Sequence, residues 1–550
     1  MREQYPVDTD AAAGQPTAAL AGPARHARDE GRSEPAAMRR RWAVLAWTAG
    51  AIAIFALFLK ISFTKGVDSD GANNALQAWD MLHGHILLHG WIIGDATYYT
   101  FELPVIAVVE IFFGLQNFTM DVAEAVIYLI VAAWAIAIAV RGSSGMSRGV
   151  RAAVVVAVLA APAVLISDMW IPLGIPDHTG TTVFLLIPCL LIDRVPGRRY
   201  IPPLLCVILA AGQIGDVTVR YVAVPAIVLA CAYRALAARR LLTADGANLL
   251  AAGLSVPLAL GVRALMLNYG SYLMVAPKTK IAPIGTWAHN ASLTWGAIRM
   301  VYGAQPGPQA APVGAATIFG YACLVISALG ILRVLCRWRT ASRAEQALAA
   351  AIAANIAVYI LSTLPAANSP HDIVAILPSG AVLAARTLVP QRISSRVVAA
   401  VATVFAMAAV VLPLEFAGSE QQPQPSLNVV GAWLKAHGLT YGLGGYWDGS
   451  AISVETRNQV AVRTVQRIHT LTGPGVAYYA WETNVLWYDP TRYYANFLLV
   501  NAAGSDMIDA TAASVFGKPD STHFIGQWEV LVYSKNLLTD LTLAPLPPTN

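Results

Sequence analysis

VDSDGANNALQAWDMLHGHILLHGW, residues 67–91, follows the first long apolar segment of the chain and opens with two aspartates, Asp68 and Asp70. Beyond Asp70 the apolar residues recur at helical spacing, at Ala72, Ala75, Leu76, Trp79 and Leu82, whereas Asn73, Gln77 and Asp80 take the other side. A two-faced helix directly after a membrane-crossing segment is expected to lie along the bilayer surface. Both carboxylates are therefore predicted at the boundary between water and lipid.

The composition is that of a membrane protein. The chain has 550 residues, of which 56% are hydrophobic and 13% charged, whereas soluble domains carry about 25% charged residues. The basic residues form no stripe with interleaved aromatics, which argues against nucleic-acid binding. All five cysteines lie in apolar stretches, so no disulfide framework is expected. The fold class predicted is a polytopic α-helical membrane protein.

Hydropathy and length predict eleven membrane spans, if about 17–25 apolar residues make one crossing. They run near residues 42–61, 119–140, 151–167, 179–193, 201–214, 220–236, 247–267, 313–335, 346–364, 373–389 and 397–414. Residues 1–41 are rich in Ala, Pro, Gly and charge, and are predicted to be a disordered cytoplasmic tail. The apolar run 101–113 is short and is predicted to be interfacial or re-entrant.

The distribution of basic residues predicts the orientation. With the N-terminal tail in the cytoplasm, the cytoplasmic flanks carry six groups of three Arg residues, whereas the outer loops hold six basic residues in all. The first outer loop (62–118) and the long loop (268–312) then face outward. The C-terminal part lies outside the plasma membrane as well.

The C-terminal part is predicted to be a separate extracytoplasmic α/β domain, residues 428–550, behind a linker at 417–427. Residues 427–437 read as an amphipathic helix and 506–516 as a second one. Strands are predicted near residues 439–446, 451–456, 459–466, 494–501 and 524–534. No phosphate-binding loop or dinucleotide glycine pattern is present.

Three outward acids are the candidate catalytic residues: Asp70, Asp68 and Asp168. A carboxylate beside a lipid surface could take a proton from an acceptor hydroxyl. Asp is equally common at helix N-caps and in first turns, where it satisfies free N–H groups. For Asp70 a catalytic role and a role as helix cap are given equal weight, whereas for Asp68 the role as helix cap is favoured.

Cationic and imidazole side chains on the outer side are the candidate substrate-binding residues: Arg220, Arg263, Lys278, His178 and His371. Arg at a bilayer edge suits a lipid phosphate, although Asp216 and Arg220 could simply form an ion pair. His83, His85 and His89 lie close together but lack an acidic or Cys partner at ligand spacing. No cofactor is predicted, and a divalent metal is possible but not indicated.

The order of these features resembles the GT-C superfamily of membrane glycosyltransferases, which use polyprenol-phosphate sugars and include protein O-mannosyltransferases and aminoarabinose transferases. The likeness rests on one span, an outer loop that opens with acids, and a surface helix containing AWDMLHG, and it is best between Val67 and Arg141. The tail motif GLTYGLGGYWD, residues 438–448, is similar to related bacterial membrane proteins. The resemblance implies that Asp70, or second Asp68, acts as the base, but Gly71 stands where related enzymes often carry a second acid.

The function predicted is transfer of a sugar from an outward-facing polyprenyl-phosphate donor to a glycan, lipid or protein hydroxyl. Two other hypotheses stay open at this point. A transporter or flippase of lipid-linked saccharides would have internal repeats and broken helices, which are not evident. A non-catalytic glycan-binding protein would use tail aromatics such as Trp447 and Trp487, although core packing is their more common role.

Overall fold

The computed structural model describes residues 30–64, 67, 69–94, 96–164, 178–194, 197–275, 279–304, 314–365, 370–393, 400, 405, 407–412, 425–470, 473–502, 508 and 513–542. The chain divides into two compact units, Met1–Ala53 and Ile54–Asn550. Every site discussed below lies within the second unit.

The first helix, α1 (Glu30–Ser62), begins well before the predicted start of the first span near residue 42. The prediction of disorder up to residue 41 is therefore wrong for residues 30–41. Glu, Ala, Met and Arg dominate this segment and are strong helix formers, so the helix continues beyond the apolar run. Within the second unit, Phe58 of α1 packs edge-on against Tyr128, with ring centroids 4.7 Å apart.

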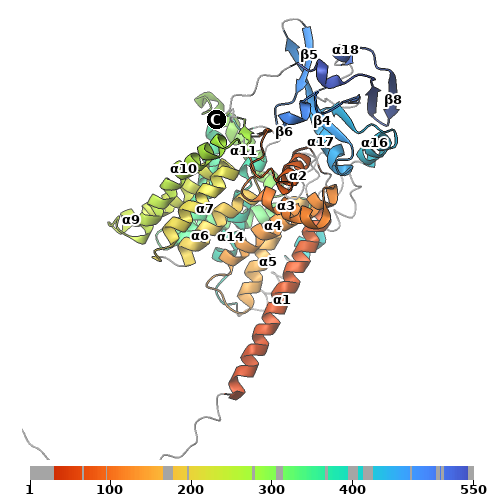
Figure 1. Ribbon diagram of the computed structural model, residues 1–550. Coiled ribbons are helices and arrows are strands. Elements are labelled where there is room, and N and C mark those ends of the chain that lie inside the picture. The colour runs from red at the N-terminus through yellow and green to blue at the C-terminus, as the bar shows by residue number, and fades with distance from the viewer. Residues whose placement is uncertain are drawn as a thin grey trace, which may run out of the picture. The chain divides into compact units, whose positions relative to one another are not determined.

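A bundle of helices forms the body of the second unit (Figure 1). Its members are α4 (Asn117–Ala139), α5 (Met146–Ala160), α6 (Val183–Arg194), α7 (Ile201–Gly215), α8 (Thr218–Tyr221), α9 (Ala223–Ala237), α10 (Ala244–Asn268), α11 (Trp287–Val301), α12 (Gly314–Cys336), α13 (Arg343–Leu361) and α14 (Ile376–Leu388). Each of the first ten predicted spans overlaps one of these helices or α1. The eleventh lies mostly outside the described residues.

Six helices in the described part of the chain are long and apolar enough to cross a membrane. This confirms a multi-pass helical membrane protein. Helices α5, α6, α7 and α14 have only 12 to 15 residues, and at 1.5 Å per residue they reach about 18–23 Å. The total of eleven spans therefore stays a prediction.

Small residues let the bundle helices approach closely. A Cβ atom added at Gly330 of α12 would lie 2.6 Å from the backbone nitrogen of Ala384 on α14. Elsewhere large apolar side chains point outward, as Leu254 on α10 and Val325 on α12 do, being 51% and 52% exposed. An apolar outer surface of this kind suits lipid rather than water.

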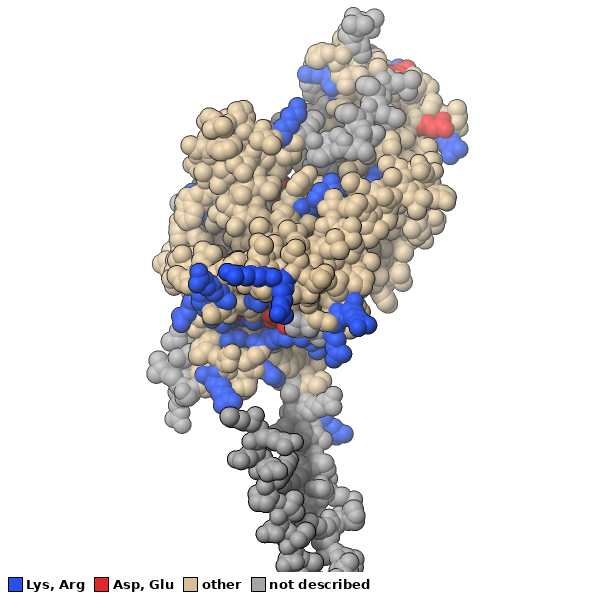
Figure 2. Space-filling view, turned by 90° about the vertical axis from the view of Figure 1, so that its left-hand side faces the viewer, with Lys and Arg blue, Asp and Glu red and all other residues tan. Residues whose placement is uncertain are grey.

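Lys and Arg side chains gather in a band near the lower end of the bundle, and the surface above the band is mostly uncharged (Figure 2). Arg386 pairs with Asp193 at 3.4 Å and with Glu345 at 3.3 Å. Arg141 and Arg337 join the same two acids, at 3.4 Å and 3.0 Å. These residues belong to the flanks predicted to be cytoplasmic, so the network fits the predicted orientation.

The first outer loop folds into α2 (Ser69–Leu82), strand β1 (Trp91–Ile93) and α3 (Glu102–Phe113). The helix predicted from the opening stretch is confirmed, but its polar side does not face water. Asn73 and Gln77 are fully buried, and Ser450 donates a 2.7 Å hydrogen bond to Asn73 Oδ1. The 12-residue helix α3 is too short to cross a bilayer.

The C-terminal part contains a six-stranded mixed sheet of order β5-β4-β3-β7-β9-β8. The strands are β3 (Tyr441–Gly444), β4 (Ala461–Thr470), β5 (Gly473–Tyr478), β7 (Phe497–Asn501), β8 (Ser521–Ile525) and β9 (Trp528–Val532). Strand β3 is parallel to β4 and β7, and the other pairings are antiparallel. Helix α16 (Pro425–Ala436) is where the first tail helix was predicted. Of the second, only α18 (Ala513–Phe516) lies in the described residues.

The strand predicted at 451–456 is wrong, because this segment lies in helix α17 (Tyr446–Glu455). Ala451, Ile452 and Val454 resemble a strand in composition, but they are buried beside α2 in a hydrophobic core that the first outer loop and the sheet share. Tertiary packing has overridden the local preference.

A second sheet links three distant parts of the chain. Strand β1 pairs in parallel with β2 (Leu273–Met274) of the long outer loop, and antiparallel with β6 (Thr483–Asn484) of the tail. In addition, the rings of Trp91 and Trp487 meet with centroids 4.8 Å apart. The tail is therefore fixed to both outer loops.

Candidate active site

The site begins where α7 ends. Thr97 and Tyr98 donate backbone hydrogen bonds of 2.9 and 2.7 Å to the carbonyl of Gly215, which fixes the following residue, Asp216, in an extended conformation. The Asp216 side chain is 1% exposed. Its Oδ1 accepts a 2.7 Å hydrogen bond from the backbone N–H of Thr218, and its Oδ2 lies 2.6 Å from Nδ1 of His178.

The buried Asp216 carboxylate has its negative charge stabilised locally. Burial alone raises the pKa of Asp216, but the nearby His178 and the hydrogen bonds from Thr218 outweigh burial and hold that pKa below its usual value. An ionised Asp216 orients the His178 ring, because Nδ1–H then donates to the carboxylate.

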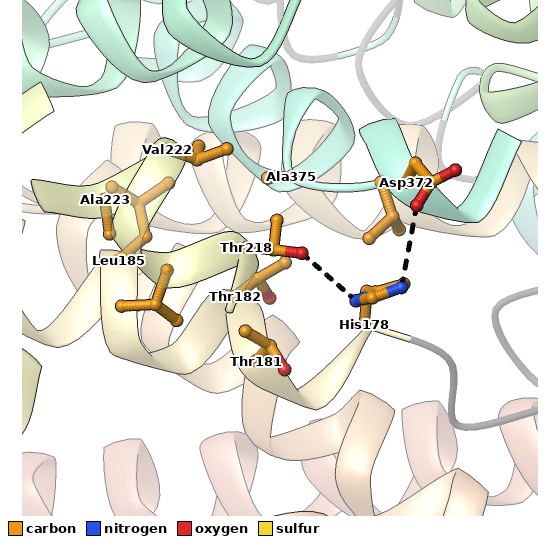
Figure 3. Close-up of a pocket in the computed structure, with 11 residues that line it drawn as sticks. His178, Thr181, Thr182, Leu185, Thr218, Val222, Ala223, Asp372 and Ala375 are labelled. Atoms are coloured by element: carbon orange, nitrogen blue, oxygen red, sulfur yellow. Dashed lines mark hydrogen bonds and ion pairs between the residues drawn. The ribbon is translucent and has the colours of Figure 1, made fainter. Parts of the chain in front are cut away.

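His178 directs its other ring nitrogen to a second carboxylate, Asp372 (Figure 3). Nε2 of His178 lies 3.8 Å from Oδ1 of Asp372. The backbone of His178 has a φ of 52°, a left-handed conformation that is uncommon for residues other than glycine. Such strained backbone is frequent at functional sites.

Asp372 and His371 come from a short 3₁₀ turn, η4 (Pro370–Ile373), just before the N-terminus of α14. Asn355 of α13 donates a 3.0 Å hydrogen bond to the backbone carbonyl of Asp372 and fixes the turn. Nε2 of His371 lies 3.9 Å from Oδ2 of Asp372. The rings of His178 and His371 are stacked, with centroids 5.7 Å apart and planes 10° from parallel.

These three side chains lie close together and line a cavity of about 690 Å³; the part of the cavity beside them is called its polar end. Apolar residues form most of its wall, among them Val222, Pro225, Ala357, Val358 and Leu361. Lys280 of the long outer loop and Trp481 of the tail also line it. The cavity thus combines an apolar wall with a polar end, the arrangement typical of small-molecule sites.

A buried acid lies close to Asp216 and His178. Glu102, the first residue of α3, is 1% exposed, and Thr181 donates a 3.3 Å hydrogen bond to its Oε1. Burial raises the pKa of Glu102 to about 8. A Cβ atom at Gly180 would lie 2.6 Å from the same Oε1, so this close packing requires glycine.

The structure brings two of the predicted substrate-binding residues together and separates the others. His178 and His371 both line the cavity. Arg220 donates to Gln213 at 3.2 Å, and the structure pairs Asp216 with His178 instead of Arg220. Arg263 donates to Ser271 and to the carbonyl of Tyr272, and its guanidinium lies 4.0 Å from the centre of the Tyr272 ring. Neither Arg220 nor Arg263 is among the residues that line the cavity.

Asp70, the first candidate base, is half-buried and accepts a hydrogen bond from the Tyr446 hydroxyl of α17. The same hydroxyl lies 3.3 Å from Oε2 of Glu482, the neighbour of Trp481. Asp70 is not among the residues that line the cavity. Asp68, Asp168 and Lys278 lie outside the described residues.

The fold of this chain is similar to that of solved structures. No protein-family model matches the sequence, and no curated protein does. Two solved structures of ArnT, the aminoarabinose transferase from Cupriavidus metallidurans, are similar in three dimensions. The apo structure has a TM-score of 0.54 at 12% identity, and the structure with undecaprenyl phosphate a TM-score of 0.53 at 12%. The chain has the GT-C fold.

The GT-C likeness extends beyond the helical bundle. The matches cover 91% and 90% of this chain and 99% of ArnT in each case, which is more than the bundle alone could supply. The archaeal oligosaccharyltransferase AglB from Archaeoglobus fulgidus, solved with an inhibitory peptide and a dolichol-phosphate, matches with a TM-score of 0.41 at 11% identity, over 83% of this chain and 70% of AglB.

Proposed function

We propose that this protein is a membrane glycosyltransferase that uses a polyprenyl-phosphate sugar as donor and acts at the extracytoplasmic side of the membrane. The GT-C fold supports the reaction class, and ArnT was solved with undecaprenyl phosphate bound. The Arg-rich band at the opposite end of the bundle supports the orientation (Figure 2).

The cavity is the main structural support for this proposed function. A lipid-linked donor has an apolar chain, a charged phosphate and a polar sugar, and it needs a site that offers all three environments. The wall formed by Val222, Val358 and Leu361 suits the isoprenoid chain, and the polar end suits the phosphate and sugar. Lys280 also lines the cavity and supplies a positive charge there.

The proposed reaction is a displacement at the anomeric carbon of the sugar. The acceptor oxygen forms the new bond to that carbon, the bond to the phosphate oxygen breaks, and the lipid phosphate leaves with the electron pair. The acceptor's proton passes to a carboxylate. Asp372 is assigned this role because it lines the cavity and its side chain is 15% exposed. Asp70, predicted from the sequence, is the second candidate.

The test compares single variants in lipid nanodiscs. Release of undecaprenyl phosphate is measured from a panel of undecaprenyl-phosphate sugars, in the presence of a glycan and lipid extract from the native membrane. Asp372→Asn is expected to lower turnover at least 100-fold, the usual range for loss of a general base. Asp540→Asn, at the tail surface beside Lys535, is the matched control and should leave turnover unchanged.

The outcome for Asp70→Asn separates the two candidate bases. If Asp70→Asn abolishes turnover and Asp372→Asn does not, the base is Asp70. If neither change lowers turnover, the assignment of the site to this cavity is wrong.

A further inference from the structure

We infer that His178, His371 and Asp372 form a binding site for a divalent transition-metal ion of the Zn²⁺ type, at the polar end of the cavity. Each residue offers one ligand atom, and all three atoms lie within 4.8 Å of one another. Two imidazoles and one carboxylate are a ligand set that zinc and related ions bind in catalytic sites.

The distances suit an ion between the three side chains. Nε2 of His178 and Nε2 of His371 lie 3.8 and 3.9 Å from the Asp372 carboxylate oxygens. Ligands bonded at about 2.0–2.1 Å in a tetrahedral site lie about 3.3 Å apart. All three ligand atoms lie within 4.8 Å of one another, so closing the site to this spacing takes a shortening of at most about 1.5 Å in any one separation.

The surroundings of His178 are a second and independent observation. Asp216 lies 2.6 Å from Nδ1 of His178 and is itself 1% exposed. A ligand histidine usually donates its other N–H to a carboxylate, which fixes the tautomer and makes the remaining nitrogen a better ligand. The Asp216–His178 pair reproduces this carboxylate–histidine arrangement, with Nε2 directed at the proposed ion.

The neighbouring turn is fixed in the same way. Asn355 holds the backbone of Asp372, so the second and third ligands are positioned by α13 as well as by η4. The three side chains, His178, His371 and Asp372, line the cavity. Three protein ligands leave a fourth position for a water or substrate oxygen, as in catalytic zinc sites.

The role of the ion rests on the proposed function, whereas its binding does not. The ion would bind Nε2 of His178 and stabilise the negative charge of the leaving phosphate. The ion would bind one carboxylate oxygen of Asp372. The other oxygen then takes the proton of the acceptor, as proposed above.

Metal binding is tested directly, without donor or acceptor. Full-length protein carrying a tag without histidine is stripped with chelator in detergent, and Zn²⁺ binding is measured by calorimetry and elemental analysis. Co²⁺ is added to a second sample for its visible absorption spectrum. We expect one ion per chain. His371→Ala should remove this ion and the Co²⁺ spectrum, whereas His469→Ala, on strand β4 of the tail, should retain both.

Asp216→Asn is expected to weaken Zn²⁺ binding about 10–100-fold and not abolish it. A thermal unfolding curve of each variant shows whether the protein is folded. Stoichiometry below one in folded wild-type protein, or equal binding by wild type and His371→Ala, would overturn the metal site. Neither result would bear on sugar transfer, which is measured separately.

Discussion

Replacing Glu102 by Gln should change the way in which stability depends on pH. Glu102 is 1% exposed at the start of α3, next to the loop that carries His178. Burial raises the pKa of Glu102 to about 8, so the folded protein keeps this proton at pH values where the unfolded chain has lost it. Glutamine keeps the shape and carries no charge.

The size of the effect follows from the pKa values. The model value for an exposed Glu is 4.5 and the folded value is about 8, so between these values the folded state binds more protons than the unfolded state. The contribution of Glu102 to the free energy of unfolding is therefore fully present below about pH 4.5. It falls by about 1.4 kcal/mol per pH unit as the pH rises, and it stops falling above about pH 8. Between pH 5 and pH 8 the loss is about 3 to 4 kcal/mol.

The measurement is the thermal unfolding midpoint in detergent at a series of pH values from 5 to 8.5, followed by tryptophan fluorescence. Wild-type protein should lose stability over this range, and Glu102→Gln should lose distinctly less. Glu529→Gln, on strand β9, serves as the control for removal of a carboxylate and should follow the wild-type curve. Parallel curves for wild type and Glu102→Gln would refute the reasoning, because Glu102 would then be ionised in the folded protein.

Two further substitutions test the packing around the site. Tyr446→Phe removes the hydroxyl that donates to Asp70. The loss of a hydrogen bond to a charged group should lower the free energy of unfolding by about 1.5–3 kcal/mol, which is seen as a lower unfolding midpoint. An unchanged midpoint would show that this hydrogen bond does not couple α17 to α2. Gly330→Ala places a methyl group 2.6 Å from the Ala384 nitrogen and should lower the free energy of unfolding by about 1–3 kcal/mol. The control is Gly253→Ala, which has no atom within 4 Å of the new methyl group and should not lower the unfolding midpoint. Equal midpoints for these two variants would contradict the close contact of α12 and α14.

The sequence was sufficient for those elements whose signal is local. Long apolar runs predicted where the helices lie, and the spacing of Ala72, Leu76 and Trp79 predicted α2. The burial of Asn73 on the other face of α2 could not be predicted, because its partner, Ser450 of α17, lies far away along the chain. The β-like run within α17 became helical for the same reason, since its environment is made by α2.

The site was predicted only in part, because no local pattern defines it. His178 and His371 stood out as imidazoles on outer loops. Asp216 was considered only as an ion-pair partner of the nearby Arg220, whereas it contacts His178, 38 residues away along the chain. The metal prediction considered residues close together in the sequence. The proposed ligands instead come from segments on either side of the eight described helices α6 to α13. Lys280 and Trp481 become visible only once the cavity is known.

The most direct test of the central claim is an experimentally determined structure of the protein with undecaprenyl phosphate bound. We predict that the phosphate lies in the cavity of about 690 Å³, in contact with Lys280 and His371, with the isoprenoid chain along Val222, Val358 and Leu361. Lipid density at another surface of the protein, with this cavity empty at saturating lipid, would contradict it.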